Sequence, residues 1–218
     1  MIFKDRRQAA RQLAEKLKRY DGKNPLVLAI PRGAVPMAQV MADALNGEMD
    51  VVLVHKLRAP YQPELAIGSV DESGHLYLSR HAADLKIDET YIREEKERQL
   101  KILRRRRAHY TPVHPPVSPV HRIVIVVDDG IATGASMIAA LRSIRAQKPA
   151  KLIAATSVAP HEGLEKIRGL ADEVECLLVP DNFYAVGQFF EEFSQVSDEE
   201  VIAILQTSRL SPPENEKD

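Results

Sequence analysis

Apolar residues along the chain recur in two patterns, each typical of one kind of secondary structure. Short apolar runs with the composition of buried strands cover residues 26–30, 51–54, 123–127, 152–158 and 174–179. Apolar residues at helical spacing cover residues 4–20, 35–45, 88–110, 135–147, 161–170 and 198–205. Strands that alternate with helices in this way are typical of a parallel sheet that binds ligands at the carboxyl ends of its strands. We therefore predict an α/β fold with a doubly wound parallel sheet.

The arrangement of the remaining segments follows from the same pattern. The run at residues 123–127 consists of β-branched residues, which suit a strand buried on both faces and predict the centre of the sheet. A weak alternation on either side of a turn predicts a hairpin, which we expect to be a mobile flap at about residues 59–78. We predict a single domain over residues 1–209 and a disordered tail at 210–218.

Charge and cysteine content limit the kinds of binding partner and the cellular compartment that we expect. The chain has 30 basic and 31 acidic residues and a formal net charge of −1, which argues against a nucleic-acid or membrane partner. Cys176 is the single cysteine, so the chain forms no internal disulfide. The N-terminus lacks the apolar core of a signal peptide, and no apolar run approaches the roughly 20 residues of a membrane helix. We expect a cytoplasmic protein.

The strongest chemical signal is a strand, an acidic pair, a short loop and a helix start over residues 124–136. Gly134 relaxes the loop, whose hydroxyl side chains and N–H groups converge at the start of a helix, where the dipole favours an anion. A phosphate would be repelled by Asp128 and Asp129 unless they face another part of the ligand. Vicinal ribose hydroxyls are donors that carboxylates accept well. The motif therefore predicts a site for a phosphorylated ribose.

This motif resembles the phosphoribosyl-diphosphate (PRPP) binding motif of the type I phosphoribosyltransferases. Residues 3–6, Phe-Lys-Asp-Arg, are similar to the start of the branch of that family known as predicted phosphoribosyltransferases. The resemblance implies the fold of that family, with a flexible hairpin and a small hood. It also implies that Asp128 and Asp129 hold the ribose hydroxyls and magnesium. The residues that it assigns to the 5-phosphate are Ile131, Ala132, Thr133, Gly134, Ala135 and Ser136.

The resemblance implies an enzyme of nucleotide metabolism that uses PRPP and magnesium. Such an enzyme transfers 5-phosphoribose to a nitrogenous base or amine and releases diphosphate. Members of the family are often dimers, so a homodimer is also implied. One departure concerns the chemistry of the acceptor, because the members that use 6-oxo purines have an aspartate where this chain has Ala132. The acceptor and the general acid or base therefore stay open.

Other parts of the chain match the family less specifically. Arg32 and Gly33 follow the first core strand and resemble the pyrophosphate loop, although Pro-Arg-Gly is also an ordinary turn. Lys56 follows the second strand and would add positive charge near the diphosphate, unless it lies in a solvated loop. Phe183 lies in a segment at about residues 180–196 that resembles the hood, where an aromatic ring stacks on the base. The alternative for Phe183 is a core aromatic residue.

A different class of function is a PRPP-sensing regulator that binds nucleic acid without transferring the sugar. The run of arginines at residues 104–107 could contact nucleic acid, although such a run is usually a solvated helix end. A nucleotide hydrolase or a phospho-acceptor domain is a further alternative, since both place acidic residues after a hydrophobic strand. The chain lacks the Gly-x4-Gly-Lys loop of the first and the acceptor aspartate and partner lysine of the second.

Overall fold

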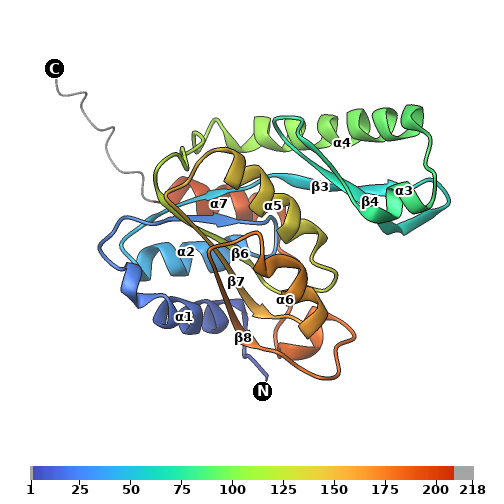
Figure 1. The fold of residues 1–218 in the computed structure, drawn as a ribbon. Coiled ribbons are helices and arrows are strands. Elements are labelled where there is room, and N and C mark those ends of the chain that lie inside the picture. The colour runs from blue at the N-terminus through green and yellow to red at the C-terminus, as the bar shows by residue number, and fades with distance from the viewer. Residues whose placement is uncertain (1, 209–218) are drawn as a thin grey trace.

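A five-stranded parallel sheet forms the centre of the protein in the computed structural model, which describes residues 2–208 (Figure 1). Its order is β2-β1-β6-β7-β8. The strands are β1 (Leu26–Ala29), β2 (Glu48–Val51), β6 (Ile123–Asp128), β7 (Lys151–Val158) and β8 (Glu173–Leu178). No helix within residues 2–208 has both the length and the apolar character needed to cross a membrane. The tail predicted at 210–218 lies outside the described residues.

Helices cover both faces of this sheet, because successive side chains of each strand point to opposite sides. In β1, Val27 and Ala29 face one layer of helices, whereas Leu26 and Leu28 face the other. The first layer is α1 (Arg6–Lys16), α2 (Val35–Ala44) and α7 (Asp198–Thr207), and the second is α5 (Ala135–Ala146) and α6 (His161–Arg168). The strand β6 is central and buried from both sides. The structure confirms the doubly wound α/β fold.

A second, antiparallel unit extends from one side of the central sheet (Figure 1). It contains the strands β3 (Val54–Ala59), β4 (Gln62–Asp71) and β5 (Leu76–Leu78), and the helices α3 (Arg80–Asp84) and α4 (Glu89–Tyr110). We call this unit the arm. Its strands pack against α4 and α5, so the arm lies next to the carboxyl ends of the central strands. The predicted hairpin is part of this sheet, and its mobility stays a prediction.

The prediction of one strand at residues 51–54 is wrong. The strand β2 ends at Val51, and a separate strand, β3, begins at Val54 in the arm. Lys56 therefore lies within β3 and not after the end of a core strand. The apolar pattern could not show this division, because it runs unbroken across the point where the chain leaves one sheet for the other.

Two buried charges explain why the sequence pattern missed the beginning of β2. Glu48 and Asp50 lie within this strand and are almost fully buried. Arg122 Nη1 lies 3.2 Å from a carboxylate oxygen of Glu48, and Arg107 Nη1 lies 3.5 Å from Asp50 Oδ1. Burial raises the pKa of Asp50, and the charge of Arg107 opposes that rise. Ion pairing thus permits a polar strand at the edge of the sheet.

Arg107→Met should lower the free energy of unfolding by about 2 kcal/mol at neutral pH. This loss is below the roughly 3–5 kcal/mol usual for breaking a buried ion pair, because Asp50 keeps two backbone N–H donors. The loss should shrink as the pH is lowered to about 5, because Asp50, whose pKa burial already raises, binds a proton more readily in the folded variant. Urea unfolding at both pH values checks this, with exposed Arg105→Met as the control. An equal loss at both would contradict it.

Candidate functional site

The acidic pair lies at the carboxyl end of the central strand. Asp128 is the last residue of β6 and pairs in register with Thr156 of β7. The N–H of Asp129 donates to Asp128 Oδ1 over 3.0 Å. Burial, with the charge of Asp129, raises the pKa of Asp128 well above its ordinary 3.8, whereas Lys56 and Arg6 lower it. A cation or a hydroxyl donor brought to Asp128 would therefore be stabilising.

Asp129 has different surroundings from its neighbour. Arg6 Nε donates to Asp129 Oδ2 over 2.8 Å, and the two side chains are only 12% and 14% exposed. The same carboxylate lies against Gly33 in the loop after β1, where an added Cβ would collide with it. Asp128, by contrast, lines the cavity beside the loop after β6. The two carboxylates are therefore not equivalent, because only Asp128 faces this cavity.

The loop after β6 has the geometry of a phosphate site. Ile131 donates its N–H to the last carbonyl of β7 over 2.8 Å, which anchors the loop to the sheet. Gly134 has φ of +83° and immediately precedes α5, whose first N–H groups have no acceptor within the helix. Residues 130–137, with Lys56 and Asp128, line a cavity of about 140 Å³. The N–H groups of a helix start, a helix dipole and a lysine together favour an anion.

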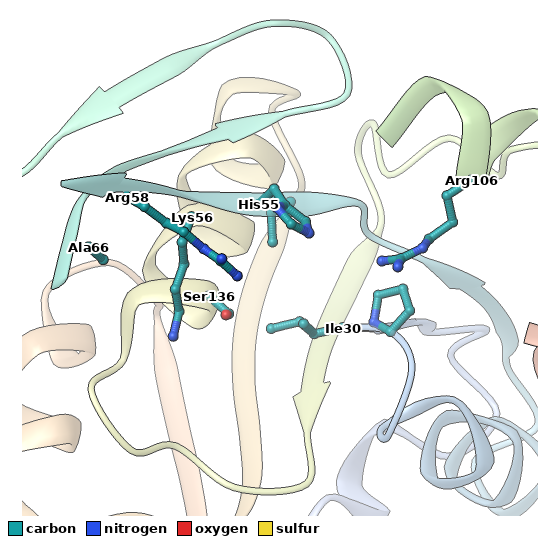
Figure 2. Close-up of a pocket in the computed structure, with 9 residues that line it drawn as sticks. Ile30, His55, Lys56, Arg58, Ala66, Arg106 and Ser136 are labelled. Atoms are coloured by element: carbon teal, nitrogen blue, oxygen red, sulfur yellow. The ribbon is translucent and has the colours of Figure 1, made fainter. Parts of the chain in front are cut away.

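A second, more basic cavity of about 280 Å³ adjoins the first (Figure 2). Lys56 and Ser136 line both cavities. Figure 2 shows Lys56 and Arg58 extending from β3 into this space, while Arg106 enters it from α4 on the opposite side. The other lining residues are Ile30, Pro31, Val54, His55 and Ala66. No carboxylate is among the described residues that line it, so the cavity suits a second anionic group.

The charge of this cavity at neutral pH comes from its lysine and arginines. Burial lowers the pKa of His55, and the positive charges of Arg106 and Arg58 lower it further. The imidazole is therefore neutral near pH 7, since its ordinary pKa is already 6.5. Lys56, Arg58 and Arg106 remain as three cations around a space large enough for a diphosphate-sized group. Their side chains come from two different elements of the arm.

The acidic pair could take part in holding a magnesium ion. Among residues 2–208, no three His, Cys, Asp or Glu side chains gather as a metal site by themselves. Magnesium does not need such a set, because it is usually held by one or two carboxylates together with phosphates of the substrate. Asp128 fits this use, since it is partly buried at the end of the central strand, lines the cavity and pairs with no arginine or lysine within residues 2–208. Asp129 fits less well, since Arg6 already neutralises it.

A family model described as "Phosphoribosyl transferase domain" matches residues 2–193. The chain belongs to the phosphoribosyl transferase family. This membership confirms the resemblance drawn from residues 124–136. The acidic pair and the loop after β6 are the segment on which that resemblance was based, and PRPP binding there stays a prediction. The cavity beside the loop after β6 and the basic cavity are therefore the candidate site of this phosphoribosyl transferase domain.

Individual relatives agree with this assignment. A Mycobacterium tuberculosis protein, described as a candidate phosphoribosyl transferase, is 40% identical over 205 residues, 94% of this chain and 46% of that protein. Uracil phosphoribosyltransferase from Mycoplasma genitalium is 25% identical over 73% of this chain and 68% of that protein. The crystal structure of TT1426 from Thermus thermophilus is 44% identical, with a TM-score of 0.84 over 94% of this chain and 98% of that one. The chain thus spans about half the length of its mycobacterial relative.

The loop predicted to meet the diphosphate has its two residues in different places. Gly33 packs against Asp129 but lines neither of the two cavities, so its role in binding stays a prediction. Arg32 points elsewhere, because its Nη1 lies 3.7 Å from Asp198 Oδ2 at the start of α7. Pro31 lines the basic cavity, whereas Arg32 lines neither of the two cavities described above. The catalytic role expected of Arg32 in this phosphoribosyl transferase domain therefore stays a prediction.

The run of arginines predicted as one surface cluster is divided by the helix that carries it. Arg107 is mostly buried and bonds to Glu72 over 2.6 Å. Arg106 lines the basic cavity, and only Arg104 and Arg105 are exposed. A continuous patch for nucleic acid is thus absent from this run, which removes the main support for the regulator. Arg106 is a residue of the candidate site that the sequence pattern did not indicate.

The aromatic residue predicted to stack on the base packs instead within the hood. The ring of Phe183 stacks on that of Phe189 with centroids 5.7 Å apart, and it is partly buried against the main core. The next residue, Tyr184, is 88% exposed. Val186 presses against Gly130, where an added Cβ would collide with its side chain, so the hood contacts the loop after β6 directly. The geometry favours a core role for Phe183, and base stacking stays a prediction.

Proposed function

We propose that this domain transfers the 5-phosphoribosyl group of PRPP to a nitrogenous base or amine and releases diphosphate. The observation that supports this most is the pair of adjoining cavities at the carboxyl ends of β1 and β6. One offers the N–H groups of a helix start to a phosphate, and the other offers three cationic side chains to a diphosphate. Lys56 and Ser136 line both, so a single ligand with phosphates at its two ends can occupy both.

Each group of residues in the site would have a separate role in the reaction. Residues 131–136 would bind the 5-phosphate, and the acidic pair, Asp128 and Asp129, would accept hydrogen bonds from the ribose hydroxyls. As the bond from C1 to the diphosphate oxygen breaks and the acceptor nitrogen bonds to C1, positive charge develops on the sugar ring, and the carboxylate of Asp128 would stabilise it. Lys56, Arg58 and Arg106 would stabilise the negative charge of the departing diphosphate. Positioning and charge then account for the rate without a covalent intermediate.

Magnesium fits this proposal at the acidic pair. Asp128, with Asp129 beside it, would hold the ion together with oxygens of the ligand. When bound, magnesium would supply additional positive charge to the diphosphate and orient the ligand. The acceptor is not defined by the loop, because Ala132 provides no acid or base there. The proposal therefore names the donor and leaves the acceptor to experiment.

The decisive experiment measures diphosphate release from PRPP and magnesium across a panel of purines, pyrimidines and small amines, with calorimetry of PRPP binding. We expect PRPP to bind and diphosphate to appear only with one class of acceptor. Ribose 5-phosphate in place of PRPP is the control, because it has the 5-phosphate and no leaving group. Binding without release for any acceptor would contradict transfer and favour the PRPP-sensing regulator. Absence of binding would contradict both functions.

A further inference from the structure

Residues 3 and 4 form part of the hood. Phe3 forms a parallel bridge with Phe190, and its N–H donates to the carbonyl of Phe189 over 2.8 Å. In return, the N–H of Glu191 donates to the carbonyl of Phe3 over 2.9 Å. The rings of Phe3 and Phe190 pack with centroids 5.4 Å apart. The hood predicted at residues 180–196 is thus completed by the N-terminal segment, which the sequence pattern indicated only as a helix.

This segment places one guanidinium between the hood and the acidic pair. Asp5 caps α1, which makes Arg6 the first residue of the helix. Arg6 Nε donates to Asp129 Oδ2 and Nη1 donates to the carbonyl of Ser194, each over 2.8 Å. The guanidinium also stacks on the ring of Phe193, with its central carbon 3.8 Å from the ring centroid. Arg6 is therefore held from three sides, and two of the three contacts are with the hood.

We propose that Arg6 is the positioning residue of the ribose site, which fixes the carboxylate of Asp129 between the hood and the loop after β1. This inference rests on the proposed function. The carboxylate of Asp129 has little room to move toward the loop after β1, because it already touches Gly33. A planar guanidinium with two directed donors and a stacking face sets an orientation that a point charge cannot set. A site held in this way is ordered before the ligand arrives.

Loss of Arg6 should act on ligand binding through Asp129. Without the guanidinium, the carboxylate of Asp129 is held only by its contact with Gly33 and lies next to Asp128 with no opposite charge on it. The sugar must then order the pair when it binds, which weakens affinity. Lysine cannot restore all three contacts, because its ammonium neither stacks as a plane nor donates from two separate nitrogens. The effect of removing Arg6 should therefore disappear once Asp129 has lost its charge.

The test is calorimetry of PRPP binding, with magnesium, to the wild type, Arg6→Met, Asp129→Asn and the double variant. We expect Arg6→Met to weaken binding about ten-fold in the wild type and by less than about two-fold in the Asp129→Asn background, as for residues that act as a unit. Arg6→Lys should fall between the wild type and Arg6→Met. Arg7→Met is the matched control, because Arg7 is the next residue of α1 and is exposed. Circular dichroism verifies that every variant is folded at the temperature used.

Each alternative result has a distinct meaning. Unchanged affinity in Arg6→Met would overturn the inference, because the guanidinium would then be a structural contact only. An equal loss in the presence and absence of the Asp129 charge would also overturn it, since Arg6 would act through the hood and not through Asp129. If the wild type itself does not bind PRPP, the proposed function is contradicted, and so is this inference, which rests on it. That result is distinguishable, because the wild type and all variants would then show no heat of PRPP binding.

Discussion

Asp128→Asn should lower acceptor-dependent diphosphate release by about a thousand-fold, the upper range for the loss of one group that stabilises developing charge. Asp128 is the carboxylate of the pair that lines the cavity beside the loop after β6. No arginine or lysine within residues 2–208 pairs with it directly. An amide of the same shape keeps the packing but cannot stabilise positive charge on the ribose ring. The measurement is kcat/KM for PRPP with the acceptor identified from the panel. Exposed Asp43→Asn on α2 is the control.

The same variant should be more stable than the wild type in EDTA. Burial raises the pKa of Asp128 in the folded protein, so the folded state binds this proton more tightly than the unfolded state. The stability of the wild type therefore falls as the pH rises from the ordinary value of 3.8 through the raised folded value. Asparagine does not titrate, so this loss should be absent. A variant that is both less active and less stable would indicate that the fold, and not the charge, was lost.

The geometry of the loop after β6 could be predicted from the sequence because all of its parts are neighbours along the chain. A strand end, an acidic pair, Gly134 and a helix start follow one another over residues 124–136. Their geometry depends on local backbone conformation, which the residues themselves favour. The alternation of apolar runs with amphipathic segments likewise predicted the sheet and its two layers of helices. In both cases, contacts within a short stretch of chain determine the result.

The cations of the second cavity could not be predicted in this way, because they come together only through the arm. The spacing of residues along α4 does indicate which arginines turn inward. Arg106 and Arg107 lie three and four residues after the buried Leu103 and so share its side of α4, whereas Arg104 and Arg105 turn outward. What the spacing cannot show is the surface that this side of the helix meets. Arg107 meets the buried Asp50, and Arg106 meets the cavity beside Pro31.

Arg6 illustrates a second limit of prediction from sequence. Its partner Asp129 is 123 residues away in the chain, and the pair forms only when the N-terminal segment joins the hood. The helical pattern of residues 4–20 describes the buried face of α1 well, but Arg6 lies at its first turn, where periodicity says little about direction. Long-range pairs of charges leave no periodic signal, so such positions are found only once the fold is known.

The double variant Arg58→Met with Arg106→Met should weaken the binding of inorganic diphosphate about a hundred-fold. Each guanidinium would form a charge-assisted hydrogen bond of about 1.5 kcal/mol, the low end for charged groups, because both side chains are partly open to solvent. Ribose 5-phosphate should bind with unchanged affinity, since its phosphate occupies the other cavity, at residues 130–137. Calorimetry with each ligand gives both numbers. A parallel loss for the two ligands would contradict the division of the site into two cavities.

A measurement without any ligand tests the geometry behind this prediction. Burial is the main reason for the low pKa of His55, and the charges of Arg106 and Arg58 lower it further. Removal of both guanidiniums should therefore raise the pKa of His55 toward its ordinary 6.5, as followed by NMR titration of the imidazole. Arg105→Met, on the outer side of α4, should leave that pKa unchanged. If the double variant also leaves it unchanged, the two arginines do not converge on this cavity, and any loss of diphosphate affinity needs another cause.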